Sequence, residues 1–252
     1  MGFTGIRKRK PLAPNTKFMC NCLSIVTYLA LVVAFFGFAA ELSPAQAGCS
    51  SSPGPGINWS KCRKRNLILS GNNFEKANLG RVDMIGSDLR DTNFNHANLE
   101  KSILTRANFS GSTLNSANFS KANAGRTSFS NSQLKQADFS KTEALRAVFK
   151  ASILQGANLS KSELGRADFS GADLSGTTIQ FANLARVNFT DANLSEADLT
   201  SSYMYRTQIE GVDLSATKGL TQDQIKLACG NAETKLPDGL AMPQNWPCAQ
   251  DD

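Results

Sequence analysis

Arginine recurs every twenty residues through the second half of the chain, and a lysine stands five positions before most of these arginines. A guanidinium group binds carboxylates and phosphates with two parallel hydrogen bonds, so a row of arginines on one surface suits an acidic protein or an anionic polymer. Phe181 stands where the lysine before Arg186 would be expected, and Tyr203 and Tyr205 follow nearby. Aromatic side chains beside arginine are typical of interface hot spots. The candidate binding residues are Arg106, Arg126, Arg146, Arg166, Arg186, Arg206, Lys101, Lys121, Lys141, Lys161, Phe181, Tyr203 and Tyr205.

No residue pattern in the sequence indicates catalysis. No nucleophile stands in a recognisable spacing with a base, and the glycines fall in repeat positions, not in a phosphate-binding loop. After residue 47 the chain has no C-x-x-C motif and a single histidine, His96, which disfavours a metal site. We therefore expect a non-enzymatic protein that uses no cofactor, metal or small-molecule substrate.

The element that must position the arginines repeats with a period of five residues. From Leu69 to Leu214 every fifth residue is a core-type centre, and these thirty centres hold fifteen Leu and nine Phe. The residue two before a centre is almost always Ala, Ser, Thr or Val. Five residues turn an α-helix by about 500°, so helical centres would drift around the helix. In a flat strand they would alternate between faces.

A chain that turns by about 90° after every five residues keeps all centres inside. Four such sides close a coil of twenty residues, and successive coils stack at about the 4.8 Å spacing of paired strands. Residues twenty apart then lie above one another, so the arginines and lysines form two columns that border one face. Glu143 and Glu163 lie between these columns. Two interpretations stay open: the columns bind an anionic partner, or they were copied with a duplicated twenty-residue unit and are merely solvated.

The motif A-[D/N]-[L/F]-x-x, as in Ala157–Lys161 and Ala167–Gly171, resembles the pentapeptide-repeat family. The resemblance implies an all-β solenoid, a right-handed quadrilateral β-helix, which we place at residues 67–219. Some members of the family imitate DNA and inhibit DNA gyrase, and this is the alternative function. That role requires acidic outer columns and a cytosolic location, whereas the columns here are basic. A secreted effector is a further alternative.

The first 47 residues are typical of an export signal. A basic start precedes an apolar stretch at residues 23–40, and Ala45-Gln46-Ala47 forms a small-x-small cleavage site. We expect cleavage after Ala47 and a location in the periplasm or cell envelope of a bacterium. The alternatives are an uncleaved membrane anchor formed by residues 23–40, or lipidation at Cys49.

Four cysteines remain after the predicted cleavage, and an even number in an exported chain suggests disulfides with three possible pairings. We predict the two local pairs, Cys49 with Cys62 in an N-terminal cap (residues 48–66) and Cys229 with Cys248 in a C-terminal cap (residues 220–252). Thr221 and Gln224 form a capping box, which predicts a short capping α-helix, with Gly230 as its stop. An irregular strap follows, and the strap or the helix is one candidate to cover Tyr203 and Tyr205.

The charge distribution narrows the choice of partner. Residues 69–219 carry sixteen Lys and Arg against fifteen Asp and Glu, so the solenoid is nearly neutral despite a net charge of +6. Nucleic-acid binding is therefore disfavoured. We expect an unknown protein or an anionic component of the envelope as the partner, with membrane contact only through an uncleaved N-terminal segment.

Overall fold

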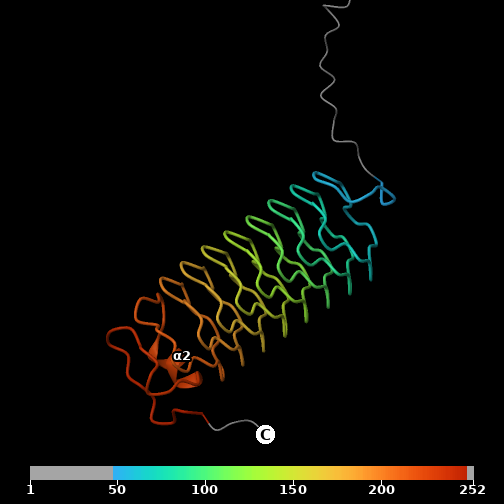
Figure 1. The fold of residues 1–252 in the computed structure, drawn as a ribbon. Helices are drawn as coiled ribbons and strands as arrows, with labels where there is room; N and C mark the ends of the chain where they lie inside the picture. The colour runs from blue at the N-terminus through green and yellow to red at the C-terminus, as the bar shows by residue number, and fades with distance from the viewer. Residues whose placement is uncertain (1–47, 249–252) are drawn as a thin grey trace, which may run out of the picture. The chain divides into compact units, whose positions relative to one another are not determined.

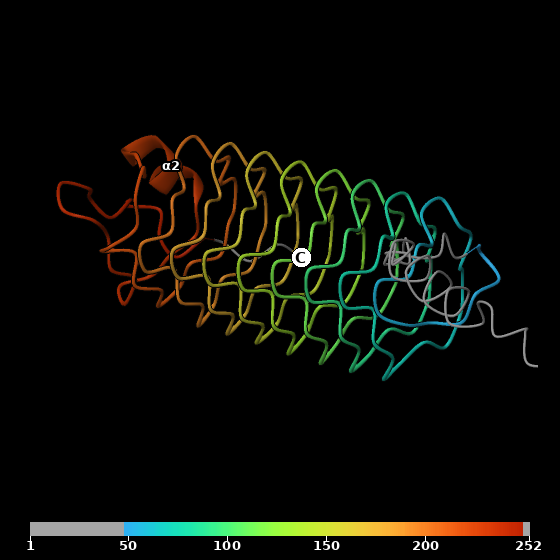
Figure 2. The same cartoon turned by 90° about the horizontal axis from the view of Figure 1, so that it is seen from above.

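The computed structural model describes residues 48–248, which belong to one compact unit, Pro44–Asp252. The chain of this unit winds into four-sided coils that stack along one axis (Figures 1 and 2). Each side contributes an isolated parallel bridge to the residue twenty positions further along, as between Asn98 and Asn118. The twenty-residue coil predicted from the sequence is confirmed.

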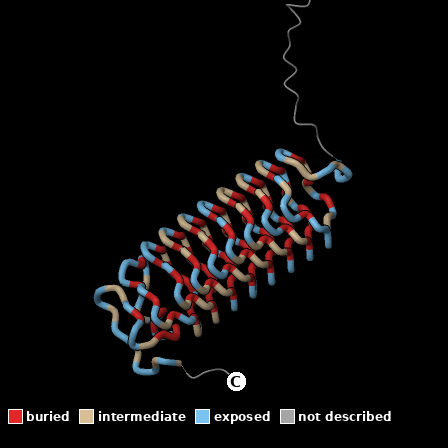
Figure 3. The backbone as a smooth tube through the Cα atoms, viewed as in Figure 1, coloured by how far each residue is buried: buried red, intermediate tan, exposed pale blue. Residues whose placement is uncertain are grey.

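The centres of the repeats form the interior, so that each side shows buried residues between exposed corners (Figure 3). Phenylalanines twenty residues apart stack on one another, with ring centroids 4.6 Å apart for both Phe119–Phe139 and Phe149–Phe169. Burying one such side chain contributes about 1.5–3 kcal/mol. The coil therefore derives its stability from inside, and its outer residues are free to serve other purposes.

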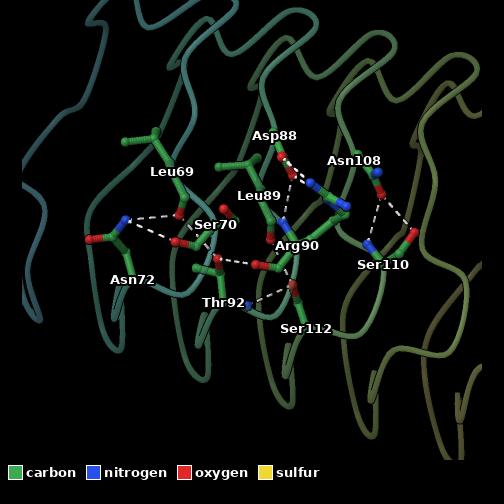
Figure 4. A network of polar contacts seen from close by, with 10 residues as sticks. All are labelled: Leu69, Ser70, Asn72, Asp88, Leu89, Arg90, Thr92, Asn108, Ser110 and Ser112. Atoms are coloured by element: carbon green, nitrogen blue, oxygen red, sulfur yellow. Dashed lines mark hydrogen bonds and ion pairs between the residues drawn. The ribbon is translucent and has the colours of Figure 1, made fainter.

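Polar side chains satisfy the backbone at two repeating positions. A buried Ser or Thr two residues before a centre donates to a carbonyl either of the previous coil, as Ser112 does to Leu89 O at 2.8 Å, or of its own coil, as Thr177 does to Leu174 O at 2.7 Å (Figure 4 shows the first kind). The Asn or Asp before a centre accepts the backbone N–H two residues later, as Asn108 Oδ1 accepts from Ser110 N at 3.0 Å. This second contact explains the Asn and Asp of the motif, because the side chain imitates a backbone turn at the corner.

The corners place their second residue in the left-handed region of backbone conformation. Arg106 has a φ of 61° and Arg206 a φ of 53°, and the lysines of the neighbouring column lie in the same range. A residue with a Cβ atom adopts this conformation at a cost of about 1 kcal/mol relative to glycine. Both basic columns therefore occupy positions where the backbone favours glycine.

The solenoid extends further at both ends than the sequence indicated. The bridge from Asn58 to Asn78 starts the register before residue 67, because Trp59 occupies a core position and is 1% exposed. At the other end Gln208 pairs with Cys229, and Asp213 pairs with Lys235. Residues that we assigned to caps thus continue the coil.

One helix, α2 (Gln222–Leu227), interrupts the last coils. It begins with the predicted capping box between Thr221 and Gln224. The helix ends before Gly230, the predicted stop, because Ala228 is already extended and leads Cys229 back into the solenoid. Gly230 lies instead directly beneath the ring of Trp246, where a side chain would not fit.

Both predicted cysteine pairs are bonded. Cys49 joins Cys62 with a Cα–Cα distance of 5.5 Å, and Cys229 joins Cys248 at 5.3 Å. The predicted signal, the anchor segment 23–40 and its cleavage site lie outside the described residues. Between residues 48 and 248 no helix has the length and apolar character needed to cross a membrane.

Candidate binding face

One side of the solenoid carries the predicted binding residues. It runs, in each coil, from the lysine corner to the arginine corner, for example from Lys161 to Arg166, and we call it the basic face. The structure brings all six arginines (the Arg column) and the four predicted lysines (the Lys column) to its two borders, because their spacing equals the coil length. Phe181 continues the Lys column, and Tyr203 and Tyr205 lie between the columns.

Four guanidinium groups of the Arg column have no partner within the described chain. Within residues 48–248 the acids between the columns form no ion pair with them: Glu163 accepts a hydrogen bond from Asn183 Nδ2 at 2.8 Å, and Glu143 accepts one from Asn123 Nδ2 at 3.3 Å. Each acid is thus held by the amide in its own column. The arginines without a hydrogen bond or ion pair from the guanidinium to another residue of 48–248 are Arg106, Arg126, Arg146 and Arg166.

The Lys column is partly neutralised. Glu100 lies 2.9 Å from Lys101 Nζ and 3.6 Å from Lys121 Nζ. The hydrogen bond from Lys101 lowers the pKa of Glu100, and its charge lowers it further. Further along, the ammonium of Lys161 lies 5.9 Å from the ring centroid of Phe181, within the range of a cation–π contact. The unpaired charge of the face is therefore concentrated on the Arg column.

Exposed apolar side chains gather on the same face. Tyr203 and Tyr205 are 51% and 42% exposed, and their rings stack with centroids 6.2 Å apart. Within residues 48–248 neither the strap nor α2 buries them, so the prediction that the cap covers these tyrosines is wrong for the described chain. Of the large apolar side chains exposed in residues 48–248, only Leu67, Ile68 and Met242 lie elsewhere. Those on the basic face are Ile103, Leu145, Phe181, Tyr203, Tyr205 and Leu227.

Three members of this apolar group were not predicted. Ile103 and Leu145 could have been found by extending the column reading to the residues between the corners. Leu227 could not, since α2 shifts the register. The backbone shows its place: Arg206 N donates to Leu227 O at 2.7 Å, as Arg186 N donates to Tyr205 O at 2.8 Å.

A shallow groove of about 440 Å³ lies in the middle of this group. Leu145 and Tyr205 bound it along the solenoid axis, and Gly165 and Ala185 occupy the two coils between them. A Cβ atom on Gly165 would lie 3.1 Å from Leu145 Cδ2, so the leucine leans over the glycine. The residues that line the groove are Leu145, Arg146, Gly165, Arg166, Asn183, Ala185, Arg186 and Tyr205.

The described chain offers no cluster of His, Cys, Asp and Glu that could hold a metal ion. His96 is an exposed corner residue with a φ of 59°. The arrangement on the basic face is thus suited to binding an anion together with an apolar group.

The family model for the pentapeptide repeat region matches residues 57–139, and the model for pentapeptide repeats in eight copies matches residues 145–180 and 179–215. The chain belongs to the pentapeptide-repeat family. Proteins of this family form right-handed quadrilateral β-helices, as the resemblance implied. Among curated proteins, no sequence matches the chain.

Solved structures of pentapeptide repeat proteins are among those that the chain matches. HetL, involved in heterocyst differentiation regulation in the cyanobacterium Nostoc sp., is 20% identical, with 75% of this chain and 86% of HetL covered and a TM-score of 0.31. Full-length QnrB1, a plasmid-mediated fluoroquinolone resistance protein, is 17% identical over 71% of this chain and 91% of QnrB1, with a TM-score of 0.39. A pentapeptide repeat protein from the thylakoid lumen of Arabidopsis thaliana is 34% identical over 46% of this chain and 77% of its own, with a TM-score of 0.20.

Proposed function

We propose that this pentapeptide-repeat protein is an exported, non-enzymatic binding protein whose basic face docks an acidic protein or an anionic envelope component. The observation that carries the proposal is the row of unpaired guanidinium groups beside exposed apolar side chains, from Arg106 to Arg166. Charges about 5 Å apart repel by somewhat under about 1 kcal/mol in water. An anionic partner would relieve this repulsion along the whole column.

Two observations support export. Residues 1–47 have the composition of a signal, and the mature chain carries two disulfides, which persist in oxidising compartments. Export to the periplasm or cell envelope agrees with both. N-terminal sequencing of the protein recovered from that compartment tests the proposal: a chain that starts at Gly48 supports cleavage, and one that starts at Met1 supports the anchored alternative.

We also propose that α2 closes the C-terminal end of the solenoid. Gln224 Nε2 donates to Leu199 O at 2.9 Å and to Ser202 O at 3.0 Å, so the helix binds backbone carbonyls at this end of the solenoid in place of a further regular coil. Trp246 Nε1 donates to Ala228 O at 2.7 Å from the strap above. A solenoid needs such closed ends to stay soluble and unpolymerised.

Charge reversal on the Arg column tests the binding function. The full chain, the variant R146E/R166E and the control K135E/K150E are compared for retention on immobilised poly-glutamate and on vesicles that contain phosphatidylglycerol. The control makes the same change in net charge at exposed lysines outside the basic face. We expect R146E/R166E to lose retention on at least one probe while K135E/K150E keeps it. Equal retention of the two variants on both probes would contradict the proposal.

The gyrase-binding alternative has less support. Imitation of DNA needs columns of acidic residues, whereas the two columns here carry arginine over six coils and lysine over four. The similarity to QnrB1 is limited to the fold.

A further inference from the structure

We infer that the groove between Leu145 and Tyr205 binds a short acidic segment of a protein that inserts an aromatic or aliphatic side chain. The inference rests on the proposed function and narrows its partner from any anion to a polypeptide. Three features of the groove carry it: its apolar walls, its mixed charge and its length.

The apolar walls of the groove gain nothing from a uniformly charged polymer, because such a polymer has no apolar surface to place against them. Leu145 is 52% exposed and Tyr205 42% exposed, and both project beside the arginines. A ligand gains from covering them only if it brings apolar surface of its own. Ligand sites generally combine such apolar lining with a few polar groups that fix orientation.

The charge of the groove is mixed. Arg146 and Arg166 present unpaired guanidinium groups that suit carboxylates. Beside them, the exposed Glu163 accepts a hydrogen bond from Asn183, which lines the groove. A membrane of anionic lipids or a polyphosphate would place negative charge against Glu143 and Glu163 as well as against the arginines. A polypeptide avoids this repulsion, because it can offer carboxylates to the arginines and amide or ammonium donors to the glutamates.

The length fits a few residues of extended chain. Leu145 and Tyr205 are three coils apart, which corresponds to about 14 Å at about 4.8 Å per coil. An extended segment rises about 3.3 Å per residue, so four or five residues span the groove. The floor is fixed by backbone bonds between coils, such as Arg166 N to Ala185 O at 2.8 Å. A preformed groove lowers the entropic cost of binding.

A random-peptide display library panned against the full chain tests the inference without assuming a sequence. We expect enriched peptides that combine Asp or Glu with Trp, Phe, Tyr or Leu within five residues. Their binding is then measured by fluorescence anisotropy on four variants of the full chain. Two are expected to disrupt the site, R146E/R166E by charge and A185L by filling the groove. Two are controls on other faces: K135E/K150E makes the same change in net charge, and T190L introduces the same leucine at another partly buried position.

The two disruptive variants should weaken peptide binding by about 30-fold or more, the effect of losing a hot spot, while both controls bind like the unmodified chain. Enriched peptides without the acidic-apolar combination, or peptides that bind A185L unchanged, would overturn the inference. Retention on poly-glutamate or on phosphatidylglycerol vesicles could require the arginines while no peptide binds A185L more weakly than the unmodified chain. In that case the inference fails and the proposed function stands. If no probe depends on the arginines, both fail.

Discussion

Two corner columns of this solenoid share one backbone and differ in their side chains. The Arg column and the column five residues beyond it both turn in the left-handed region, with a φ of 57° at Arg126 and also at Asn131. Apart from Ala151, the second column carries Asn or Asp, which this conformation accepts more readily than Arg, or glycine. Its members are Gly71, Asp91, Gly111, Asn131, Ala151, Gly171, Asp191 and Gly211, and we call it the glycine-rich column.

The difference bears on the duplication hypothesis. A duplicated twenty-residue unit copies both columns together, yet only the Arg column remains uniform over six coils. Seven of the eight residues of the glycine-rich column are Gly, Asn or Asp, the types that this backbone conformation accepts most readily. Arginine therefore persists where the backbone does not favour it and where like charges are stacked. The backbone conformation therefore does not explain the Arg column, which agrees with the binding role that we propose for it.

The largest effect is expected in the interior, which both columns share. Phe149 is fully buried, with its ring stacked on Phe169. The substitution Phe149→Ala should lower the free energy of unfolding by about 3–5 kcal/mol, because it removes transfer energy and leaves a cavity. Urea denaturation measures the change. A decrease in the free energy of unfolding of less than 1 kcal/mol would mean that the buried phenylalanine stacks do not stabilise the solenoid as described.

Exchanging residues between the two columns should give smaller effects of opposite sign. Arg166→Gly should raise the free energy of unfolding by up to about 1 kcal/mol, because glycine suits a φ of 59°. Gly171→Arg should lower it by about 1 kcal/mol through the backbone alone, since no atom lies within 4 Å of the added Cβ. Denaturation of both variants checks the pair. If Arg166→Gly destabilised the protein instead, arginine would contribute to the stability of the fold, and the contrast between the two columns would be wrong.

The smallest effect concerns acid, and it originates on sides of the coil away from the Arg column. Hydrogen bonds from Ser215 and Lys235 lower the pKa of Asp213 to about 2, and a hydrogen bond from Thr200 lowers the pKa of Asp198. Because these pKa values lie below that of an unfolded aspartate, their contribution is complete above about pH 4 and is lost as the pH falls toward 2. Asp213→Asn should therefore flatten the acid dependence of unfolding slightly. The same slope in both proteins would contradict this assignment.

Much of the fold was predictable because the repeat is strictly periodic. The period of five defines the coil, and the twenty-residue spacing alone brings Arg146, Arg166 and Arg186 into one column.

What could not be predicted has physical reasons. The glycine-rich column hints at left-handed corners, but the basic columns obscure that signal, because Arg and Lys occupy the corners more often than Gly does. Leu227 escaped column counting because α2 shifts Cys229 out of the twenty-residue register with Gln208. The groove depends on Leu145 leaning over Gly165, a side-chain contact that periodicity does not specify.

The central claim is that the Arg column serves a partner and not the fold. Unfolding curves of the unmodified chain and of R146G/R166G, each with and without an excess of an acidic peptide, test it most directly. We expect R146G/R166G to be at least as stable as the unmodified chain without peptide. Added peptide should stabilise only the unmodified chain, since a ligand stabilises the state that binds it. A less stable R146G/R166G that is stabilised by the peptide to the same extent would contradict the account.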